Sequence, residues 1–234
     1  MSRSWSVFDF ILSWLGGLVG TGLFFAAGVA SGNDDWTIVL SLAGQYVGSL
    51  GVFWILTRYK SVTDIGLTIN SGDFFYIALG LVLQLALALV FLPLNELLFP
   101  DGRPQQEVAD IIANADTTFL RVALVAAAVV LGPVTEELMY RGVLLRSLES
   151  RGRVFAMVVS SVVFAAVHLT GLDTSQFWLS AAAFLPPLFI LGLVLAWLTQ
   201  RTGRLGPAIF LHSGWNLLSA FVLLLPTEVL EQVS

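Results

Sequence analysis

Long apolar segments separated by short polar stretches run through the whole chain. A membrane-spanning helix needs about 20 mostly apolar residues, and the pattern predicts seven such helices. Their expected bounds are Phe8 to Ala30, Trp36 to Thr57, Phe74 to Phe99, Phe119 to Ser147, Val154 to Thr170, Phe177 to Thr199 and Leu205 to Leu225. We therefore expect an all-α fold, a polytopic membrane bundle of about seven transmembrane helices.

The connection between the third and fourth predicted helices has a different pattern. Between Pro104 and Ala115, the apolar residues Val108, Ile111 and Ile112 share one helical face, and polar residues occupy the other. This pattern predicts a short amphipathic helix at the membrane surface. The chain then divides into residues 1–100, a packing scaffold of three helices, 101–118, an extracytoplasmic connector, and 119–234, a core of four helices.

Composition supports a membrane protein and excludes several other classes. Apolar residues make up 57% of the 234 residues and charged residues only 12%, against roughly 25% charged residues in a soluble domain. The formal charge is −5 and no basic patch is present, so we expect no nucleic-acid partner. The chain has no cysteine, which excludes disulfides, thiolate catalysis and Cys-ligated zinc.

The basic residues fall mainly on one side of the predicted bundle. Eight of the eleven lie in segments that alternate to the same side: Arg3, Arg58, Lys60, Arg146, Arg151, Arg153, Arg201 and Arg204. Because cytoplasmic loops carry an excess of Lys and Arg, we expect the N-terminus in the cytoplasm and the C-terminus outside.

The fourth predicted helix carries three charged residues, Glu136, Glu137 and Arg141, within six positions. A charge at the membrane centre costs roughly 2.5 to 3.5 kcal/mol, so these residues need partners or a function. Glu137 and Arg141 are four residues apart and are expected to pair on one helix face. That pair is either a buried structural ion pair or an orienting device, whereas Glu136 has no partner in its own helix.

Both histidines of the chain, His168 and His212, lie in predicted spans. Counting from Arg151 in the turn between the fourth and fifth helices gives 15 residues back to Glu136 and 17 forward to His168. In an antiparallel hairpin both side chains then lie at a similar depth, roughly 22 to 26 Å from the turn. Glu136 and His168 are therefore expected to approach each other.

His212 and Asn216 are one helical turn apart in the seventh predicted helix and share a face. His212 is only about 14 Å along its helix from Gly203. It reaches the depth of Glu136 only if that turn lies deeper in the membrane or the helix tilts. Taken alone, Asn216 is more often a hydrogen-bonding contact between helices.

A carboxylate, two imidazoles and a carboxamide in one membrane pocket suit the activation of water. Glu136 together with His168 would take a proton from a water molecule. Donors preset where an oxyanion forms lower a barrier by several kcal/mol, a role that suits His212 and Asn216. The expected chemistry is hydrolysis within the membrane.

Three motifs, all within apolar spans, resemble the CPBP family, the CAAX-protease and bacteriocin-processing group that is also called Abi. They are Glu-Glu-x-x-x-Arg at 136–141, Phe-x-x-x-His at 164–168 and His-x-x-x-Asn at 212–216, in this order. The resemblance covers about residues 119–220 and makes 119–234 a CPBP-like catalytic core. It implies an intramembrane endopeptidase similar to the CAAX prenyl endopeptidases, which remove a C-terminal tripeptide after a lipidated cysteine.

The resemblance also implies roles for single residues. Glu136 with His168 would activate water, His212 and Asn216 would stabilise the oxyanion, and Glu137 and Arg141 would orient Glu136 and His168. No cofactor is expected, although Glu136, His168 and His212 would also make a three-ligand zinc site. The chain lacks the His-Glu-x-x-His motif of zinc peptidases.

Two other functions are consistent with intramembrane Glu and His residues. A proton-coupled transporter would distribute its polar residues between repeated halves, and the N-terminal half offers none that suits this role. A non-catalytic scaffold or bacteriocin-immunity-type protein of the same family would keep the same motifs. For the peptidase, the expected partners are the lipid bilayer and a membrane-anchored or lipidated peptide or protein, in a prokaryotic cell membrane.

Overall fold

The computed structural model describes residues 4–100, 117–172 and 176–224. Every regular element in these ranges is helical, and seven helical runs are long and apolar enough to cross a membrane. They are Val7–Ser31, Asp34–Leu56, Ser71–Leu98, Thr118–Arg151, Arg153–Thr170, Phe177–Thr202 and Gly206–Leu224. The protein is therefore an integral membrane protein with the expected all-α fold. The amphipathic helix predicted between Pro104 and Ala115 lies outside the described residues.

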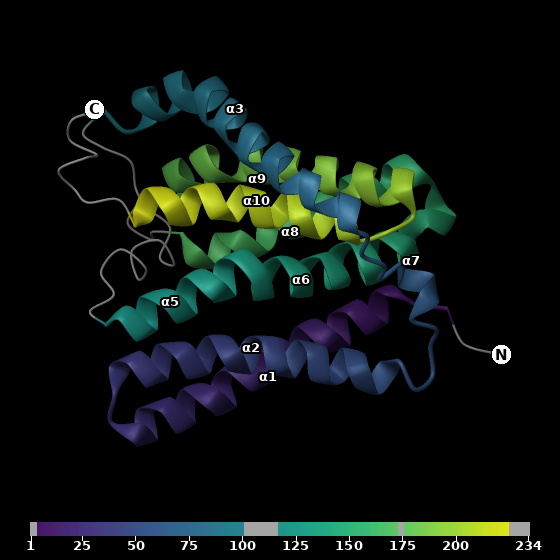
Figure 1. Cartoon of the computed structure of the whole chain (residues 1–234), viewed down its shortest axis with the longest axis horizontal. Helices are drawn as coiled ribbons and strands as arrows, with labels where there is room; N and C mark the ends of the chain where they lie inside the picture. Colours follow the sequence, from purple (N-terminus) through teal and green to yellow (C-terminus); the bar gives the residue numbers. More distant parts are fainter. Residues whose placement is uncertain (1–3, 101–116, 173–175, 225–234) are drawn as a thin grey trace.

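The elements follow one another in a simple order (Figure 1). Six α-helices have regular bounds: α1 (Val7–Ser31), α2 (Asp34–Leu56), α3 (Phe75–Leu98), α8 (Arg153–Val167), α9 (Phe177–Thr202) and α10 (Gly206–Leu223). Three short 3-10 turns flank them: η1 (Thr63–Ile65), η2 (Ser71–Phe74) and η6 (His168–Gly171). The fourth span consists of α5 (Thr118–Ala126), η3 (Ala127–Leu131), α6 (Gly132–Glu136), η4 (Glu137–Leu145), α7 (Arg146–Leu148) and η5 (Glu149–Arg151).

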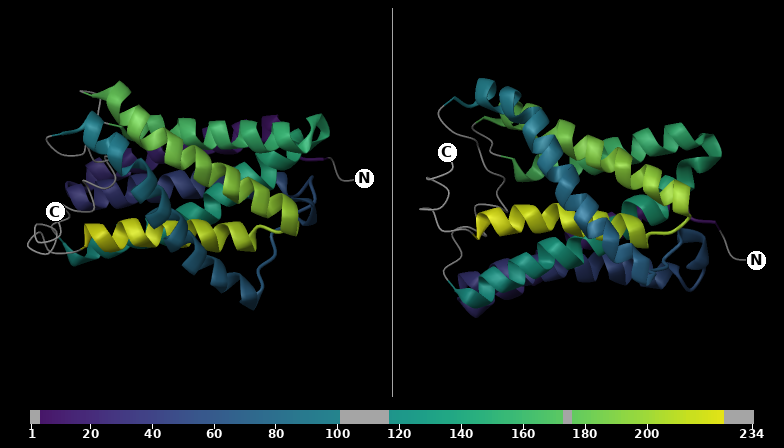
Figure 2. Two further views of the ribbon diagram at one scale, coloured as in Figure 1. Left: turned by 90° about the horizontal axis from the view of Figure 1, so that it is seen from above. Right: turned by 45° about the horizontal axis from the view of Figure 1, so that its top comes forward.

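The fourth span lies between two groups of helices. The α1–α2 hairpin packs on one side of it, and α3, α8, α9 and α10 lie on the other (Figures 1 and 2). Helix α3 crosses α10 obliquely and also contacts α9. The buried apolar core gathers around the fourth span, where Val143, Leu145 and Phe164 have no exposed surface.

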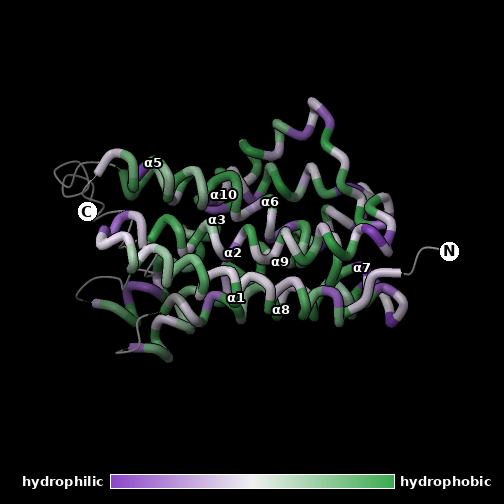
Figure 3. Tube along the Cα trace, turned by 90° about the horizontal axis from the view of Figure 1, so that it is seen from below, coloured by the Kyte–Doolittle hydropathy of each residue, from purple (hydrophilic) through white to green (hydrophobic). Residues whose placement is uncertain are grey.

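Polar residues collect near the ends of the helices and apolar residues fill the middle (Figure 3). Many large apolar side chains point outward, as with Leu97 and Trp178, which are 78% and 81% exposed. In a soluble protein such a surface would drive association. Here it is the surface that the bilayer covers.

A seam of glycines joins α1 to α2. A Cβ atom on Gly20 would collide with the carbonyl oxygen of Gly44, and one on Gly48 would collide with that of Gly16. The two backbones therefore approach each other closely, as small residues allow in membrane helices. Gly22 on the same helix has no atom within 4 Å of its Cβ position, so it lies outside the seam.

We expect Gly20→Val to separate α1 from α2 and to lower the free energy of unfolding by about 1–3 kcal/mol or more, because overpacked contacts force the backbone to shift. The matched control is Gly22→Val on the same helix. Thermal unfolding in detergent measures both variants. Equal losses of stability in the two variants would show that the loss comes from helix propensity and not from the contact between α1 and α2.

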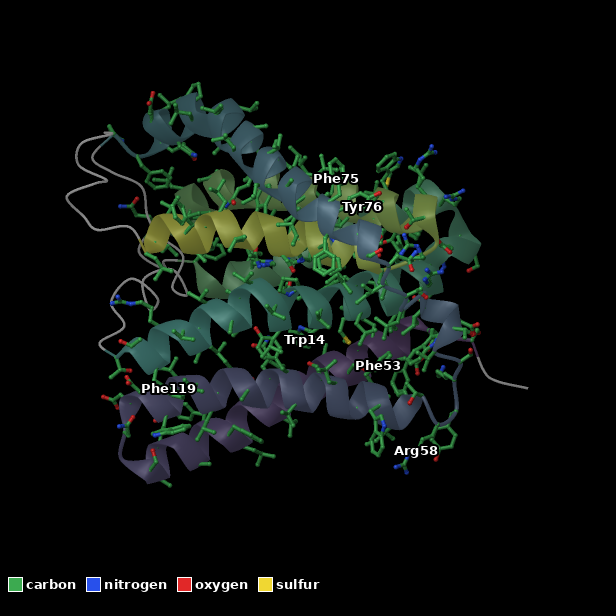
Figure 4. All side chains as sticks on the ribbon, in the orientation of Figure 1. Trp14, Phe53, Arg58, Phe75, Tyr76 and Phe119 are labelled. Atoms are coloured by element: carbon green, nitrogen blue, oxygen red, sulfur yellow. The ribbon has the colours of Figure 1, made fainter. Side chains whose placement is uncertain are left out.

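The segments that carry most basic residues meet at one end of the bundle, where Figure 4 labels Arg58. Lys60 Nζ pairs with Asp9 Oδ2 at 2.6 Å and donates to the carbonyl oxygen of Ser4 at 2.8 Å. Arg204 forms a two-point ion pair with Asp73 at 2.7 and 2.9 Å. These contacts place the N-terminal segment and the connections after α2 and α9 side by side.

The turn after the fourth span belongs to the same end. Arg146 donates to the carbonyl oxygen of Gly203 at 2.9 Å, and Arg153 donates to that of Gln200 at 3.0 Å. Helix α1 begins at this end and α10 finishes at the opposite one (Figure 1). The described spans thus run alternately away from and toward this end of the bundle, as the distribution of basic residues predicted.

Candidate active site

The fourth span contains two π-helical segments close to the charged residues. It passes from α5 into the π-helical segment η3, back to α6, and then into a second π-helical segment, η4, which begins at Glu137. π-Helical turns are rare and occur frequently at functional sites. Glu136 and Glu137 lie directly at the start of the second π-helical segment.

Pro133 leaves a gap in the backbone hydrogen bonds of the fourth span, and Asn216 fills it. The N–H of Gly132 donates to the carbonyl oxygen of Ala127, so the next donor in a π-helical ladder would be residue 133. Proline has no N–H, and the carbonyl oxygen of Ala128 is left without that donor. Asn216 on α10 supplies one, with its Nδ2 atom 2.7 Å from the oxygen. One of the two N–H groups of Asn216 thus forms a hydrogen bond between helices, which is the usual role of an asparagine in a membrane helix.

Glu137 and Arg141 form the predicted ion pair, and both side chains are fully buried. Arg141 Nη1 lies 3.0 Å from Glu137 Oε1, and Arg141 Nη2 donates to the carbonyl oxygen of Gly192 at 3.2 Å. The guanidinium also stacks over the ring of Phe164 at 4.3 Å. Buried charges are costly unless they are paired and hydrogen-bonded, and this pair has contacts to α8 and α9.

His212 reaches the charged residues of the fourth span. Its Nδ1 donates to Glu137 Oε1 at 2.9 Å, which turns the opposite ring nitrogen, Nε2, toward Glu136 Oε2 at 3.9 Å. His212 reaches the depth of Glu136 because of where α10 begins. In the views of Figures 1 and 2, α10 begins deeper in the bundle than the turn between α7 and α8.

Glu137 therefore contacts His212. The family resemblance gives Glu137 and Arg141 an orienting role toward Glu136 and His168. The direct contact of Glu137 falls on His212, and Arg141 approaches His168 only through the ring of Phe164.

Glu136 is the acid that has no hydrogen-bond partner. Within the described ranges its carboxylate makes no hydrogen bond, and Oε2 is buried. The side chain as a whole is 32% exposed, so its other oxygen, Oε1, is the accessible one. The predicted lack of a neutralising neighbour on its own helix is confirmed.

His168 is the first residue of η6, where α8 ends. Its Nδ1 donates to the carbonyl oxygen of Phe164 at 2.8 Å, which leaves Nε2 free to accept a proton. The Phe164 ring meets His168 at 5.1 Å and His212 at 5.6 Å, both edge to face. The two imidazoles thus share one aromatic ring, but no nitrogen of His168 lies within the 4 Å ion-pair distance of a Glu136 oxygen.

A three-ligand metal site does not form from these side chains as they lie. Across the described ranges, no three His, Asp or Glu side chains converge closely enough to hold a metal ion. Glu136, His168 and His212, the three candidate zinc ligands, fall within those ranges. A zinc site made from these three residues stays an alternative for experiment to test.

Tyr46 on α2 is a residue that the sequence analysis missed. A Cβ atom at Gly132 would lie 3.5 Å from the Tyr46 hydroxyl and 3.6 Å from Glu136 Oε1. The first three spans thus bring a polar group to the site, although we expected only scaffold there. Because a tyrosine in an apolar span is commonly a packing or interface residue, no sequence signal distinguished it.

One of three comparisons with known proteins found a match, and it lies in the C-terminal half. Residues 118–218 match the family model described as type II CAAX prenyl endopeptidase Rce1-like. Neither the curated proteins nor the solved structures that were compared with the chain gave a match. The matched stretch includes every candidate site residue from the motifs, Glu136, Glu137, Arg141, His168, His212 and Asn216. The fourth to seventh spans are therefore similar to type II CAAX prenyl endopeptidases of the Rce1-like family.

Proposed function

We propose that this protein is an intramembrane endopeptidase that hydrolyses a peptide bond with a water molecule activated by Glu136. The observation that carries this proposal is that the carboxylate of Glu136 makes no hydrogen bond and lies 3.9 Å from His212 Nε2, while His212 Nδ1 is held by the buried Glu137. A structural acid at this depth would be paired, because an unpaired intramembrane charge is costly. An acid that must receive a proton during a reaction needs a free oxygen.

The proposed reaction uses the side chains in two groups. Glu136 takes a proton from water, with His168 Nε2 as a second acceptor, and the water oxygen attacks the carbonyl carbon of the substrate. The resulting oxyanion receives hydrogen bonds from the remaining N–H of Asn216 and from His212 Nε2 when that atom carries a proton. The C–N bond then breaks, and the proton is delivered to the leaving amine.

Glu137 and Arg141 support this chemistry by holding His212 in position. Glu137 holds the Nδ1 side of His212, and Arg141 holds Glu137. Such a chain fixes which ring nitrogen faces the substrate, as a carboxylate does for a histidine in other hydrolases.

The proposed substrate is a lipidated peptide or protein that is anchored in the membrane. The matching family is one of prenyl endopeptidases, and an active site among spanning helices admits a chain that is already held at the bilayer. By the bias of basic residues, the end that carries Lys60, Arg146 and Arg204 faces the cytoplasm. The substrate would then enter from the cytoplasmic leaflet of a prokaryotic cell membrane.

The test is a cleavage assay with the full chain in lipid vesicles. The substrates are a farnesylated peptide that ends in a CAAX sequence and the same peptide without the lipid. We expect release of the C-terminal tripeptide from the farnesylated form, identified by mass spectrometry, and at least tenfold slower release from the other. A scaffold or immunity-type protein would cleave neither peptide.

The same assay with an excess of a strong chelator tests the metal alternative. A reaction driven by Glu136 alone keeps its rate. Loss of cleavage that added zinc restores would contradict this mechanism and would favour a site made from Glu136, His168 and His212.

A further inference from the structure

The hydroxyl of Tyr46 and the carboxylate of Glu136 border one small space above Gly132. The position that a Cβ of Gly132 would take lies 3.5 Å from Tyr46 Oη, 3.6 Å from Glu136 Oε1 and 3.2 Å from the carbonyl oxygen of Ala127. Three oxygen atoms from two separate spans therefore surround a space that would otherwise hold a methyl group.

The two side-chain oxygens at this space have no other hydrogen-bond partner. Among the residues that the structure describes, neither Tyr46 Oη nor Glu136 Oε1 makes a hydrogen bond. Oε2 of Glu136 is buried against the protein on the side of His212. Oε1 is therefore the oxygen to which water has access, and it is the one that faces Gly132 and Tyr46.

Glycine is not required at position 132 by the backbone. Its φ of −57° and ψ of −61° are helical values that any residue can adopt. A glycine inside a helix costs roughly 1 kcal/mol relative to alanine, so its presence here needs another reason. The space beside Glu136 Oε1 is such a reason.

We propose that this space holds the water molecule that Glu136 activates, and that Tyr46 is its positioning residue. This inference rests on the proposed peptidase function. The water donates one hydrogen to Glu136 Oε1 and accepts one from the Tyr46 hydroxyl, which leaves its second hydrogen for His168 Nε2 and one lone pair free to attack the substrate. As Glu136 takes its hydrogen as a proton, the water oxygen forms the new C–O bond, the C–N bond breaks, and the leaving nitrogen receives the proton.

Two variants test the inference in the vesicle assay with the farnesylated peptide. Tyr46→Phe removes one hydrogen bond to the water, so kcat should fall roughly tenfold while KM changes less than about twofold. Gly132→Ala places a methyl group where the water lies, so kcat should fall roughly a hundredfold. The unfolding temperature of Gly132→Ala should change little, because the gain in helix propensity is offset by the 3.2 Å approach of the new Cβ to the carbonyl oxygen of Ala127.

Two matched controls accompany these variants. Gly51→Ala lies on α2, as Tyr46 does, and has no atom within 4 Å of its new Cβ, while Tyr76→Phe removes a hydroxyl from α3. Both should keep the wild-type kcat. If the wild type cleaves and Tyr46→Phe and Gly132→Ala keep kcat, or lose activity only through KM or unfolding, the inference is wrong and the peptidase function stands. If the wild type fails to cleave, both proposals fall.

Discussion

Replacing Glu136 by Gln is expected to lower kcat for the farnesylated peptide by roughly 10²- to 10⁴-fold, the range that a general base contributes. Glutamine keeps the size of the side chain but has no basic carboxylate oxygen to receive the proton. Because Glu136 makes no hydrogen bond within the described ranges, its replacement breaks no such contact and should leave the unfolding temperature unchanged. Tripeptide release, measured at saturating substrate, reads out kcat.

The matched control for this change is Glu96→Gln. Glu96 is an exposed acid on α3 and takes no part in the site. It should retain wild-type cleavage. Undiminished cleavage by Glu136→Gln would remove Glu136 from the mechanism and would return the protein to the scaffold class.

Replacing Arg141 by Met is expected to lower the free energy of unfolding by about 3–5 kcal/mol, because it leaves Glu137 as a buried charge without its cation. Methionine fills a similar volume, so lost packing adds little. Arg141 is also in contact with Gly192 and Phe164, which ties the fourth span to α9 and α8. Thermal unfolding in detergent measures the loss.

The double change Glu137→Leu with Arg141→Met separates structure from orientation. Replacing both members of a buried ion pair by apolar residues is often neutral or stabilising, so stability should return toward the wild-type value. Activity should remain low, because His212 has then lost the carboxylate that holds its Nδ1 atom. Recovery of both stability and cleavage would reduce the pair to a structural role. Arg58→Met, an exposed arginine stacked on Trp54, is the control and should cost at most about 0.5 kcal/mol.

The fold could be predicted because the membrane imposes it. Apolar runs of spanning length must be helices, and the observed spans agree with the expected ones within a few residues. The ion pair of Glu137 with Arg141 also follows from helical spacing, and it occurs at 3.0 Å. These features depend only on local periodicity, which the sequence carries directly.

Contacts between distant helices were harder to predict. The contact of Glu137 with His212 depends on how deep α10 begins, and hydropathy locates helix ends only to within a few residues. The approach of Tyr46 depends on how the α1–α2 hairpin packs on α6, which no motif encodes. The two π-helical segments were likewise not predicted, because a hydrophobic period of 3.6 residues cannot reveal them.

The proline at position 133 has a consequence for any attempt to transplant this catalytic arrangement. Because the backbone gap that it opens in one helix is closed by an amide from another, Pro133 and Asn216 form a single unit. A design that copies the acids, histidines and asparagine but replaces the proline would restore a competing main-chain donor. The asparagine would lose its anchor and could rotate away from the substrate, although every residue of the three motifs was still present.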